Sequence, residues 1–340
     1  MAAADPALAQ ARDVVRLLVG GAAEVTRIAS GGRNSRIWRV SSGNGAFALK
    51  QYPPRADDPR DRLSTEIGAL RLMERFHIDT VPRVVGVDSE RGFALLSWID
   101  GNDVCEIGDG DIDAAVVFLS AIHALRATPW AAEQPLASEA CLCGVEIERQ
   151  IGARYERLAG LDGETELIEF LEGYLRAEIA RALREARALV TSAGLDFSTE
   201  LPQEWRSLVP ADFGFHNSLR RSDGSLAFVD FEYFGWDDPV KLTADIMLHP
   251  GRPLLPMQRR RFRQAASRLY GGDPGFAGRL RAYLPLFGLR WTLILLNEFI
   301  PERWQRRPVA GDSASWIDAK ARQLARAREF LTAMPEKLEE

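Results

Sequence analysis

Apolar and polar residues alternate in short runs near the start of the chain, which predicts a small antiparallel sheet. Turns rich in glycine, asparagine and serine separate these runs, and the third run places Leu49 on one face and Lys50 on the other. An Ala-rich periodic segment before the first run predicts a peripheral helix that covers the sheet. The strands are expected at residues 25–28, 36–41, 46–52, 84–87 and 93–99.

After the expected sheet, apolar residues recur every three to four positions, which predicts helices. One helix is also expected between the strands, with Asp58 as its N-cap and Pro59 at its first position. Glu66 lies on the flank of the apolar stripe of that helix. The other helices are expected at residues 112–125, 146–160, 164–193, 239–248, 259–270, 276–290, 291–299 and 319–334.

A hairpin in the second half of the chain carries the densest group of candidate catalytic residues. Its strands are expected at residues 218–220 and 226–229, joined by a Ser-Asp-Gly turn. Because a tight turn brings the outer ends of two strands together, Asp212, Asn217 and Asp230 should converge. Two carboxylates and an amide oxygen suit a divalent cation such as Mg²⁺ together with one general base.

Two further groups of candidate residues lie in the region of the sheet. Lys50, late in its strand, is either a solvated edge charge or a phosphate-binding lysine, and Glu66 is either solvated or its inward-facing partner. The turn at residues 30–35 contains Gly31 and Gly32, whose backbone N–H groups can cover nucleotide phosphates. A Gly-Gly hairpin turn needs no ligand, so these residues alone are a weak indication of a phosphate site.

The hairpin region contains three motifs: Asp212-x-x-x-x-Asn217, the strand end at 229–232 (Val-Asp-Phe-Glu), and Gly-x-x-Asp-Pro at 235–239 with Asp245 beyond it. Together they resemble the aminoglycoside phosphotransferase family, the small-molecule relatives of protein kinases in the choline kinase-like superfamily. The resemblance implies an α+β, protein-kinase-like fold of two lobes. The expected lobes are a small antiparallel-sheet N-lobe that binds the nucleotide (1–99) and a mostly helical C-lobe with the catalytic loop and acceptor-binding helices (100–340).

By this resemblance, Asp212 is the catalytic base, and Asn217 and Asp230 hold Mg²⁺. The implied reaction moves the γ-phosphoryl group of ATP or GTP to a hydroxyl of a small molecule, such as an amino sugar, a sugar or an amino alcohol. Lys50, held by Glu66, would position the α- and β-phosphates. The other residues expected to bind the nucleotide are Gly31, Gly32, Asn34 and Ser35 in the glycine turn, and Leu96 and Trp98 in the hinge between the lobes.

The chain departs from the family at Pro210, because the family usually has a His two residues before the catalytic Asp. His216, inside the loop, either contacts substrate or phosphate or gives the support that the missing His would provide. The departure leaves one alternative function open, a catalytically weak or silent nucleotide- or metabolite-binding protein of the same fold. The complete set of Lys50, Glu66, Asp212, Asn217 and Asp230 argues against this alternative, because a silent relative has no chemical need for all five. A protein kinase is disfavoured, since no activation segment ending in Ala-Pro-Glu follows Asp230.

The Asp-Phe-Gly tripeptide at 212–214 spells the magnesium-binding motif of protein kinases. In that role it would need an upstream catalytic Asp with an Asn five residues later. The nearest upstream Asp is Asp196, and Leu201 stands five residues beyond it. Asp230, and not Asp212, is therefore the expected metal ligand.

Composition and charge narrow the choice of partners. The chain has 340 residues, an apolar fraction of 46% and a net charge of −5 without a dense basic stripe, so no nucleic-acid partner is expected. Three cysteines do not form a disulfide framework, which favours a reducing, cytoplasmic location. The most apolar run, residues 291–296, is far below the ~20 residues of a membrane span, so no membrane partner is expected. Oligomeric state is not predicted.

Residues 100–113 contain six acids and no lysine or arginine. A solvated loop followed by a helix start explains them without a ligand. Alternatively, they form an anionic rim that attracts a cationic acceptor such as an amino sugar or a quaternary amine.

Overall fold

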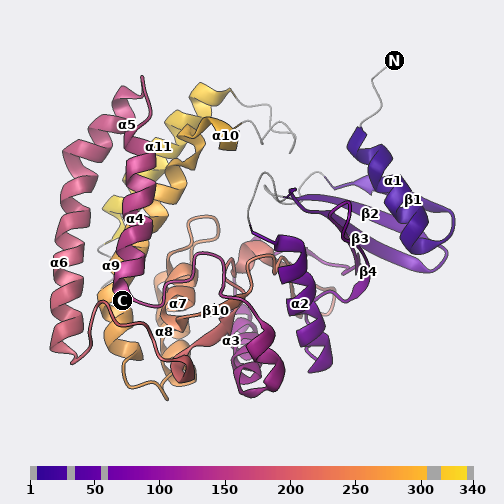
Figure 1. The fold of residues 1–340 in the computed structure, drawn as a ribbon, viewed down its shortest axis with the longest axis horizontal. Helices are drawn as coiled ribbons and strands as arrows, with labels where there is room; N and C mark the ends of the chain where they lie inside the picture. Colours follow the sequence, from indigo (N-terminus) through magenta and orange to yellow (C-terminus); the bar gives the residue numbers. More distant parts are fainter. Residues whose placement is uncertain (1–5, 29–34, 55–59, 305–314, 335–340) are drawn as a thin grey trace.

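The computed structural model describes residues 6–28, 35–54, 60–304 and 315–334. The chain forms a sheet flanked by two helices and a larger, mostly helical part, which lie side by side in Figure 1. This is the α+β architecture with a small antiparallel sheet that the sequence predicts. Within the described ranges, every helix falls short of the length and apolarity that crossing a membrane requires.

Five antiparallel strands form the sheet in the order β1-β2-β3-β5-β4, so that β3 is central. The five predicted strands are confirmed, with ends that differ by at most two residues. Lys50 pairs with Ile37 on one side and Ala94 on the other, so it is not on an edge of the sheet. The strands are β1 (Ala23–Arg27), β2 (Arg36–Ser42), β3 (Gly45–Gln51), β4 (Val84–Asp88) and β5 (Phe93–Ser97).

The two faces of the sheet are covered by different helices. α1 (Pro6–Val19) covers one face, as predicted, and its buried Val14 and Val15 belong to a small core with Trp38 and Leu49. Because side chains alternate along a strand, Lys50 points to the opposite face, where α2 lies. The sheet thus separates a structural face from the face that carries the candidate chemistry.

α2 begins three residues later than the sequence indicates. It spans Arg62–Arg75, and its N-cap is Asp61, whose carboxylate accepts a hydrogen bond from the Ser64 N–H at 3.1 Å. The prediction of Asp58 as the cap is wrong, and Asp58 and Pro59 lie outside the described residues. Three acids, Asp57, Asp58 and Asp61, precede the apolar stripe, so capping preference alone does not choose between them.

The larger part of the molecule is built around α9, a largely buried helix that contacts α4, α6, α7 and α11. The prediction of two helices meeting at Arg290 and Trp291 is wrong, because no glycine or proline separates these residues and α9 continues through them. The predicted helix 164–193 is interrupted by a π-helical turn at Leu171–Leu175. The helices are α3 (Asp109–Ala124), α4 (Gly144–Ala159), α5 (Thr165–Phe170), α6 (Arg176–Ser192), α7 (Pro239–Leu248), α8 (Pro256–Leu269), α9 (Phe276–Leu295), α10 (Pro301–Trp304) and α11 (Trp316–Thr332).

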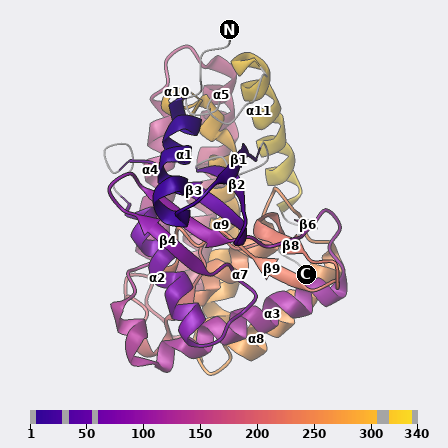
Figure 2. The same cartoon turned by 90° about the vertical axis from the view of Figure 1, so that its right-hand side faces the viewer.

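Short strands position the candidate catalytic loop, in a three-stranded sheet β6-β8-β9 and a pair β10-β7. The predicted hairpin is present as β8 and β9. The other three strands were not predicted, because two or three residues are too few to show an alternation. The three-stranded sheet lies beside α3 (Figure 2), where Phe228 stacks on Phe118 with ring centroids 4.5 Å apart. The strands are β6 (Asn102–Asp103), β7 (Ser207–Val209), β8 (Ser218–Arg220), β9 (Leu226–Phe228) and β10 (Gly235–Asp237).

The connection that precedes α4 runs alongside β10. The Trp236 N–H donates to the Pro135 carbonyl at 2.9 Å, and the Ala137 N–H donates to the Trp236 carbonyl at 3.0 Å. Only glycine permits this approach at position 235, since a Cβ there would lie 2.4 Å from the Pro135 carbonyl oxygen. The contact places Ser138 and Glu139 close to Tyr233, which follows the β8–β9 hairpin.

His123 of α3 packs against Ser207 and Tyr270, outside the candidate site. Its Nδ1 lies 2.9 Å from the Ser207 hydroxyl, and its ring meets Tyr270 edge-on at 4.9 Å. Burial, with a smaller effect of Arg126, lowers the pKa of His123 from 6.5 to about 4.

The shifted pKa of His123 predicts a loss of stability in acid. Below pH 6.5 the unfolded chain binds a proton that the folded protein takes up only near pH 4, so the free energy of unfolding should fall as the pH falls through this window. Urea denaturation at pH 7, 5.5 and 4 should show a shallower decline for His123→Gln than for the wild type. Equal declines would contradict this assignment.

Candidate active site

Lys50 links the sheet to the helical part through buried ion pairs. Its Nζ lies 2.6 Å from Glu66 Oε2, 2.6 Å from Asp230 Oδ1 and 3.4 Å from Glu232 Oε2. Burial lowers the pKa of Lys50, but the charges of Asp230 and Glu66 outweigh this effect, and the pKa lies well above its usual range. The lysine is therefore a fixed positive charge, not a solvated one.

Glu66 is held on both of its carboxylate oxygens. Oε2 also accepts a hydrogen bond from the Tyr52 hydroxyl at 2.7 Å, and Oε1 accepts one from the Phe231 N–H at 3.1 Å. The carboxylate is buried, with only 1% of its side chain exposed. The structure thus pairs Glu66 with Lys50, as the sequence analysis expects, and ties α2 to the residue that follows Asp230.

Glu232, whose role the sequence leaves open, is a buried residue that connects Arg62, Ser35 and Lys50. Arg62 donates to its Oε1 at 2.6 Å, and the Ser35 hydroxyl donates to its Oε2 at 3.0 Å. Burial raises the pKa of Glu232, but the charges of Lys50 and Arg62 outweigh it and hold the pKa below its usual range. With both oxygens occupied and 2% of the side chain exposed, Glu232 is poorly placed to bind a metal ion.

Asp230 is the most accessible of the three acids around Lys50, with 28% of its side chain exposed. Its backbone has φ = 71°, in the left-handed region, which is unusual for a residue other than glycine and often marks a functional site. Burial and the charges of Glu232 and Glu66 raise the pKa of Asp230 to about 7, although Lys50 opposes them. A hard divalent cation would favour its ionised form, and a carboxylate is a ligand that Mg²⁺ prefers.

Asn217 lies where the hairpin closes toward Asp230. Its carbonyl accepts a hydrogen bond from the Val229 N–H at 3.0 Å, and its side-chain Nδ2 donates to the Asp212 carbonyl at 2.9 Å. Because the amide nitrogen is used in this way, the amide oxygen is the atom that Asn217 can offer to a cation. Asn217 and Asp230 together form an oxygen donor set that fits Mg²⁺.

Asp212 follows a tight and strained turn. Its N–H donates to the Pro210 carbonyl at 2.9 Å across Ala211, which has φ = 61°. A hydrogen bond between residues two apart defines a γ-turn, and the form with positive φ is rare and strained. Pro210, which replaces the expected His, therefore acts on Asp212 through its backbone carbonyl.

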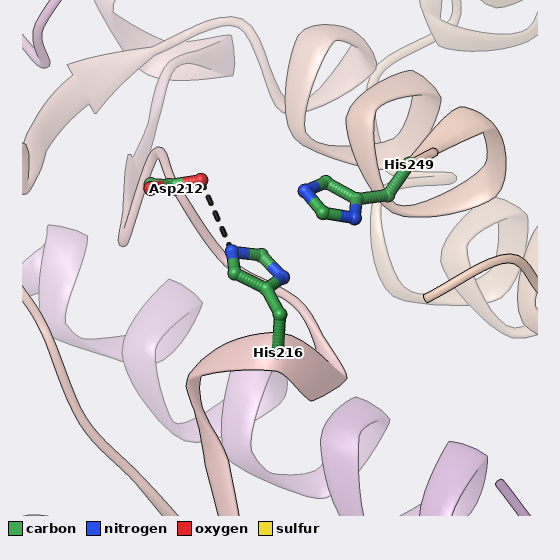
Figure 3. Close-up of side chains that lie close together, drawn as sticks. All are labelled: Asp212, His216 and His249. Atoms are coloured by element: carbon green, nitrogen blue, oxygen red, sulfur yellow. Dashed lines mark hydrogen bonds and ion pairs between the residues drawn. The ribbon is translucent and has the colours of Figure 1, made fainter. Parts of the chain in front are cut away.

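Two stacked imidazoles face the Asp212 carboxylate (Figure 3). His216 Nε2 lies 3.2 Å from Asp212 Oδ1, and the rings of His216 and His249 are 4.0 Å apart and 3° from parallel. His249 in turn meets Trp291 edge-on at 4.9 Å. Gly214 leaves room for this arrangement, since a Cβ there would lie 2.8 Å from His216 Nδ1.

The surroundings keep Asp212 ionised. Burial raises its pKa, but the hydrogen bond of His216 and the charges of His216 and His249 outweigh burial, and the pKa lies below its usual range. The side chain is 39% exposed, so a reacting group can approach it. An ionised, accessible carboxylate is able to accept a proton.

The structure describes only some of the other residues expected to bind the nucleotide. Gly31, Gly32 and Asn34 lie outside the described residues. Leu96 is inside the sheet, opposite Ala48, and the Trp98 side chain donates to Asp100 at 2.9 Å. Their roles, like those of Lys50, Glu66, Ser35, Asp212, Asn217 and Asp230, stay predictions.

Arginines from other segments pair with part of the acidic run at 100–113. Arg220 of β8 binds both oxygens of Asp111 at 2.8 Å, and Arg261 of α8 binds Asp113 at 2.5 and 2.9 Å. These pairs offset two of the six acidic charges on which the inference of a cationic acceptor was based. The run itself contains no arginine, so its charge balance is set by tertiary contacts.

Three contributors to the site were missed from the sequence. Arg62 braces Glu232, Tyr52 donates to Glu66, and His249 stacks on His216. Tyr52 follows Lys50 by two residues and so shares its face of the strand, which is a usable signal. No local pattern points to His249, which lies directly after α7, because its partner is distant in the sequence.

Three features define a kinase-like phosphotransferase fold. They are the sheet with the buried pair of Lys50 and Glu66, Asp230 after the hairpin, and the larger helical part. Residues 24–278 match the phosphotransferase enzyme family, and the chain belongs to this family. It is therefore a small-molecule kinase. No curated protein sequence is significantly similar to the chain.

Solved structures share the fold over nearly the whole chain at low sequence identity. Choline kinase from Cryptosporidium parvum Iowa II has a TM-score of 0.61 and 13% identity, with 98% of this chain and 96% of that one covered. Choline kinase LicA from Streptococcus pneumoniae has a TM-score of 0.57 and 16% identity, covering 97% and 100%. A putative aminoglycoside phosphotransferase from Ralstonia eutropha JMP134 has a TM-score of 0.58 and 14% identity, covering 96% and 98%.

Proposed function

We propose that the chain transfers the γ-phosphoryl group of ATP or GTP to a hydroxyl group of a small molecule. The observation that carries this proposal is the contact of Lys50 with both Glu66 and Asp230 at 2.6 Å, which joins the sheet to the end of the hairpin. One structural neighbour of 16% identity is a thermostable mutant of the aminoglycoside phosphotransferase APH(4)-Ia. Its structure is a ternary complex with ADP and hygromycin B. A cytoplasmic location, where both nucleotides are abundant, is part of the proposal.

In the proposed reaction, a bond forms between the acceptor oxygen and the γ-phosphorus while the bond from this phosphorus to the β–γ bridging oxygen breaks. Asp212 accepts the proton of the acceptor hydroxyl. Lys50 positions the nucleotide phosphates, and Glu66 keeps the lysine in place. Asn217 and Asp230 would hold Mg²⁺, which when bound would offset the charge of the phosphate groups.

The test is a Mg²⁺-dependent transfer assay with purified protein. Radiolabelled ATP and GTP are offered separately with a panel of sugars, amino sugars and amino alcohols, and each product is identified by mass spectrometry. Transfer to at least one hydroxyl, lost when EDTA removes Mg²⁺, is the expected result. Nucleotide binding without transfer to any acceptor or to water would favour a silent binding protein instead.

His216 and His249 would act as positioning residues in this reaction. His216 contacts the Asp212 carboxylate directly, and the parallel stack with His249 limits rotation of the His216 ring. The pair thus supplies side-chain support that Pro210 does not give. Neither histidine needs to touch the substrate for this role.

Two substitutions of His249 test whether its effect on turnover depends on ring stacking against His216. His249→Ala should lower kcat about tenfold, less than the ~10²-fold that a 1 Å misplacement of a catalytic group can cause. His249→Phe is the matched variant, because it keeps an aromatic ring against His216, and it should retain most of the activity. Both variants should leave the KM for the nucleotide unchanged. Equal losses of kcat in the two variants would contradict the stacking role.

A further inference from the structure

The segment beside β10 carries Glu139, whose carboxylate is bound by arginines from two helices. Arg154 of α4 donates to both of its oxygens at 2.6 Å, and Arg290 of α9 donates to Oε2 at 2.6 Å. Glu139 has φ = 55°, a strained conformation that only its surroundings maintain. Arg290 is buried, with 6% of its side chain exposed. It therefore offsets the negative charge of Glu139 on the side that faces the protein interior.

Further arginines extend this region to α10, which an ion pair connects to α4. Arg157, three residues after Arg154, forms an ion pair with Glu302 of α10 at 3.3 Å. Arg303 is exposed and has no ion pair with any residue in the described part of the chain. Partial burial and the like charges of Arg154 and Arg157 lower the pKa of Arg303, although the charge of Glu139 opposes them. We call Arg154, Arg157 and Arg303 the arginine cluster.

Contacts through Ser138 and Tyr233 connect the arginine cluster to the candidate active site. The Ser138 N–H donates to the Tyr233 carbonyl at 3.1 Å, and Arg60 donates to the Ser138 hydroxyl at 3.2 Å. The Arg60 guanidinium also lies 5.1 Å from the centre of the Tyr233 ring. The Arg62 guanidinium, which donates to Glu232 of the candidate active site, lies 5.0 Å from the centre of the same ring.

An arginine-rich helix face is often only a solvated surface. Here, however, the guanidinium groups come from two helices, and Arg303 adds a charge that has no ion-pair partner among the described residues. Like charges held together in this way are stabilised by an anion. Guanidinium groups also match the planar, bidentate geometry of carboxylate and phosphate groups.

We propose that the acceptor carries an anionic group, a carboxylate or a phosphate ester, which the arginine cluster binds while the acceptor hydroxyl faces Asp212. This inference rests on the proposed function and names the substrate class for that site. A cationic acceptor would meet repulsion at this end of the site. Its main support, the acidic run at 100–113, is partly neutralised by Arg220 and Arg261.

The test compares acceptors that share a carbon skeleton and differ in charge. Glucose, glucosamine, glucuronate and glucose 6-phosphate form one set; glycerol, 3-aminopropane-1,2-diol, glycerate and glycerol 3-phosphate form another. Phosphoryl transfer from ATP or GTP is measured for each compound. We expect kcat/KM to be highest for an anionic member of a set. The carboxylate and phosphate members show which of the two anions the site takes.

Variants of the exposed Arg303 then test the cluster directly. Arg303→Ser should raise the KM for the anionic acceptor by about ten- to a hundredfold, the range for a lost hydrogen bond between charged groups. Arg303→Glu should raise it further, while kcat and the KM for the nucleotide stay within twofold. Arg184→Ser, which removes an exposed arginine from α6, is the matched control and should change none of these values.

The outcomes distinguish the two proposals. A preference for the amino compounds, or an unchanged acceptor KM in both Arg303 variants, would overturn the anionic acceptor and leave the phosphotransferase proposal standing. Absence of transfer to every acceptor and to water would overturn the proposed function itself. An anionic preference that Arg303→Glu abolishes would support both.

Discussion

Asp212→Asn should lower turnover by about 10²–10⁴-fold, the usual contribution of a general base. The amide keeps the shape of the side chain, so the stacked histidines and the loop should stay in place, but it cannot accept the hydroxyl proton. The KM for the nucleotide should change little, because Lys50 and its carboxylate partners are untouched. Steady-state kinetics with saturating acceptor measure both quantities.

Asp223→Asn is the matched control for this variant. Asp223 is an exposed acid in the turn between β8 and β9, where it accepts hydrogen bonds from Ser225 at 2.9 and 2.7 Å. The same chemical change there should leave turnover unchanged. Normal turnover in Asp212→Asn would remove Asp212 from the mechanism.

Lys50→Met should destabilise the folded protein by about 3–5 kcal/mol, the range observed when one partner of a buried ion pair is removed. Glu66 and Glu232 are only 1% and 2% exposed, so their charges would remain in the interior without the lysine. The variant should also lose tight nucleotide binding. Urea denaturation at neutral pH measures the first effect, and calorimetric titration with ATP and Mg²⁺ measures the second.

Two companion variants separate buried charge from lost packing. Lys50→Met combined with Glu66→Gln should recover about half of the lost stability, since it removes one of the stranded charges. Arg83→Met breaks the surface pair with Asp79, whose side chains are 63% and 67% exposed, and should cause no measurable loss. A Lys50→Met variant as stable as the wild type would mean that the carboxylates around Lys50 are not ionised.

Local patterns in the sequence predict most of the fold. The five strands, the β8–β9 hairpin and α7 need only residue alternation, turn chemistry and helical spacing, which act over a few neighbouring residues. Errors occurred where local signals were ambiguous. Asp58 was chosen over Asp61 as the cap of α2, α9 was divided in two, and the strands β6, β7 and β10 were missed.

The candidate catalytic residues could be selected from the sequence because their spacing is itself local. Asp212 and Asn217 share one loop, and Asp230 ends the neighbouring strand. Which of them meet Lys50 depends on how the sheet packs against the helical part. The 2.6 Å contact between Lys50 and Asp230 joins residues 180 positions apart.

The sequence by itself determined the secondary structure of the sheet and hairpin, the family motifs and a small set of candidate acids. Only the tertiary structure decided which charges are paired: Glu232 with Arg62, Asp111 with Arg220, and Glu139 with Arg154 and Arg290. It also brought His249 against the ring of His216, and arginines from α4 and α9 onto Glu139. The physical reason is range, because hydrogen bonding and side-chain periodicity act between sequence neighbours, whereas charge pairing and ring stacking depend on segments that packing alone brings together.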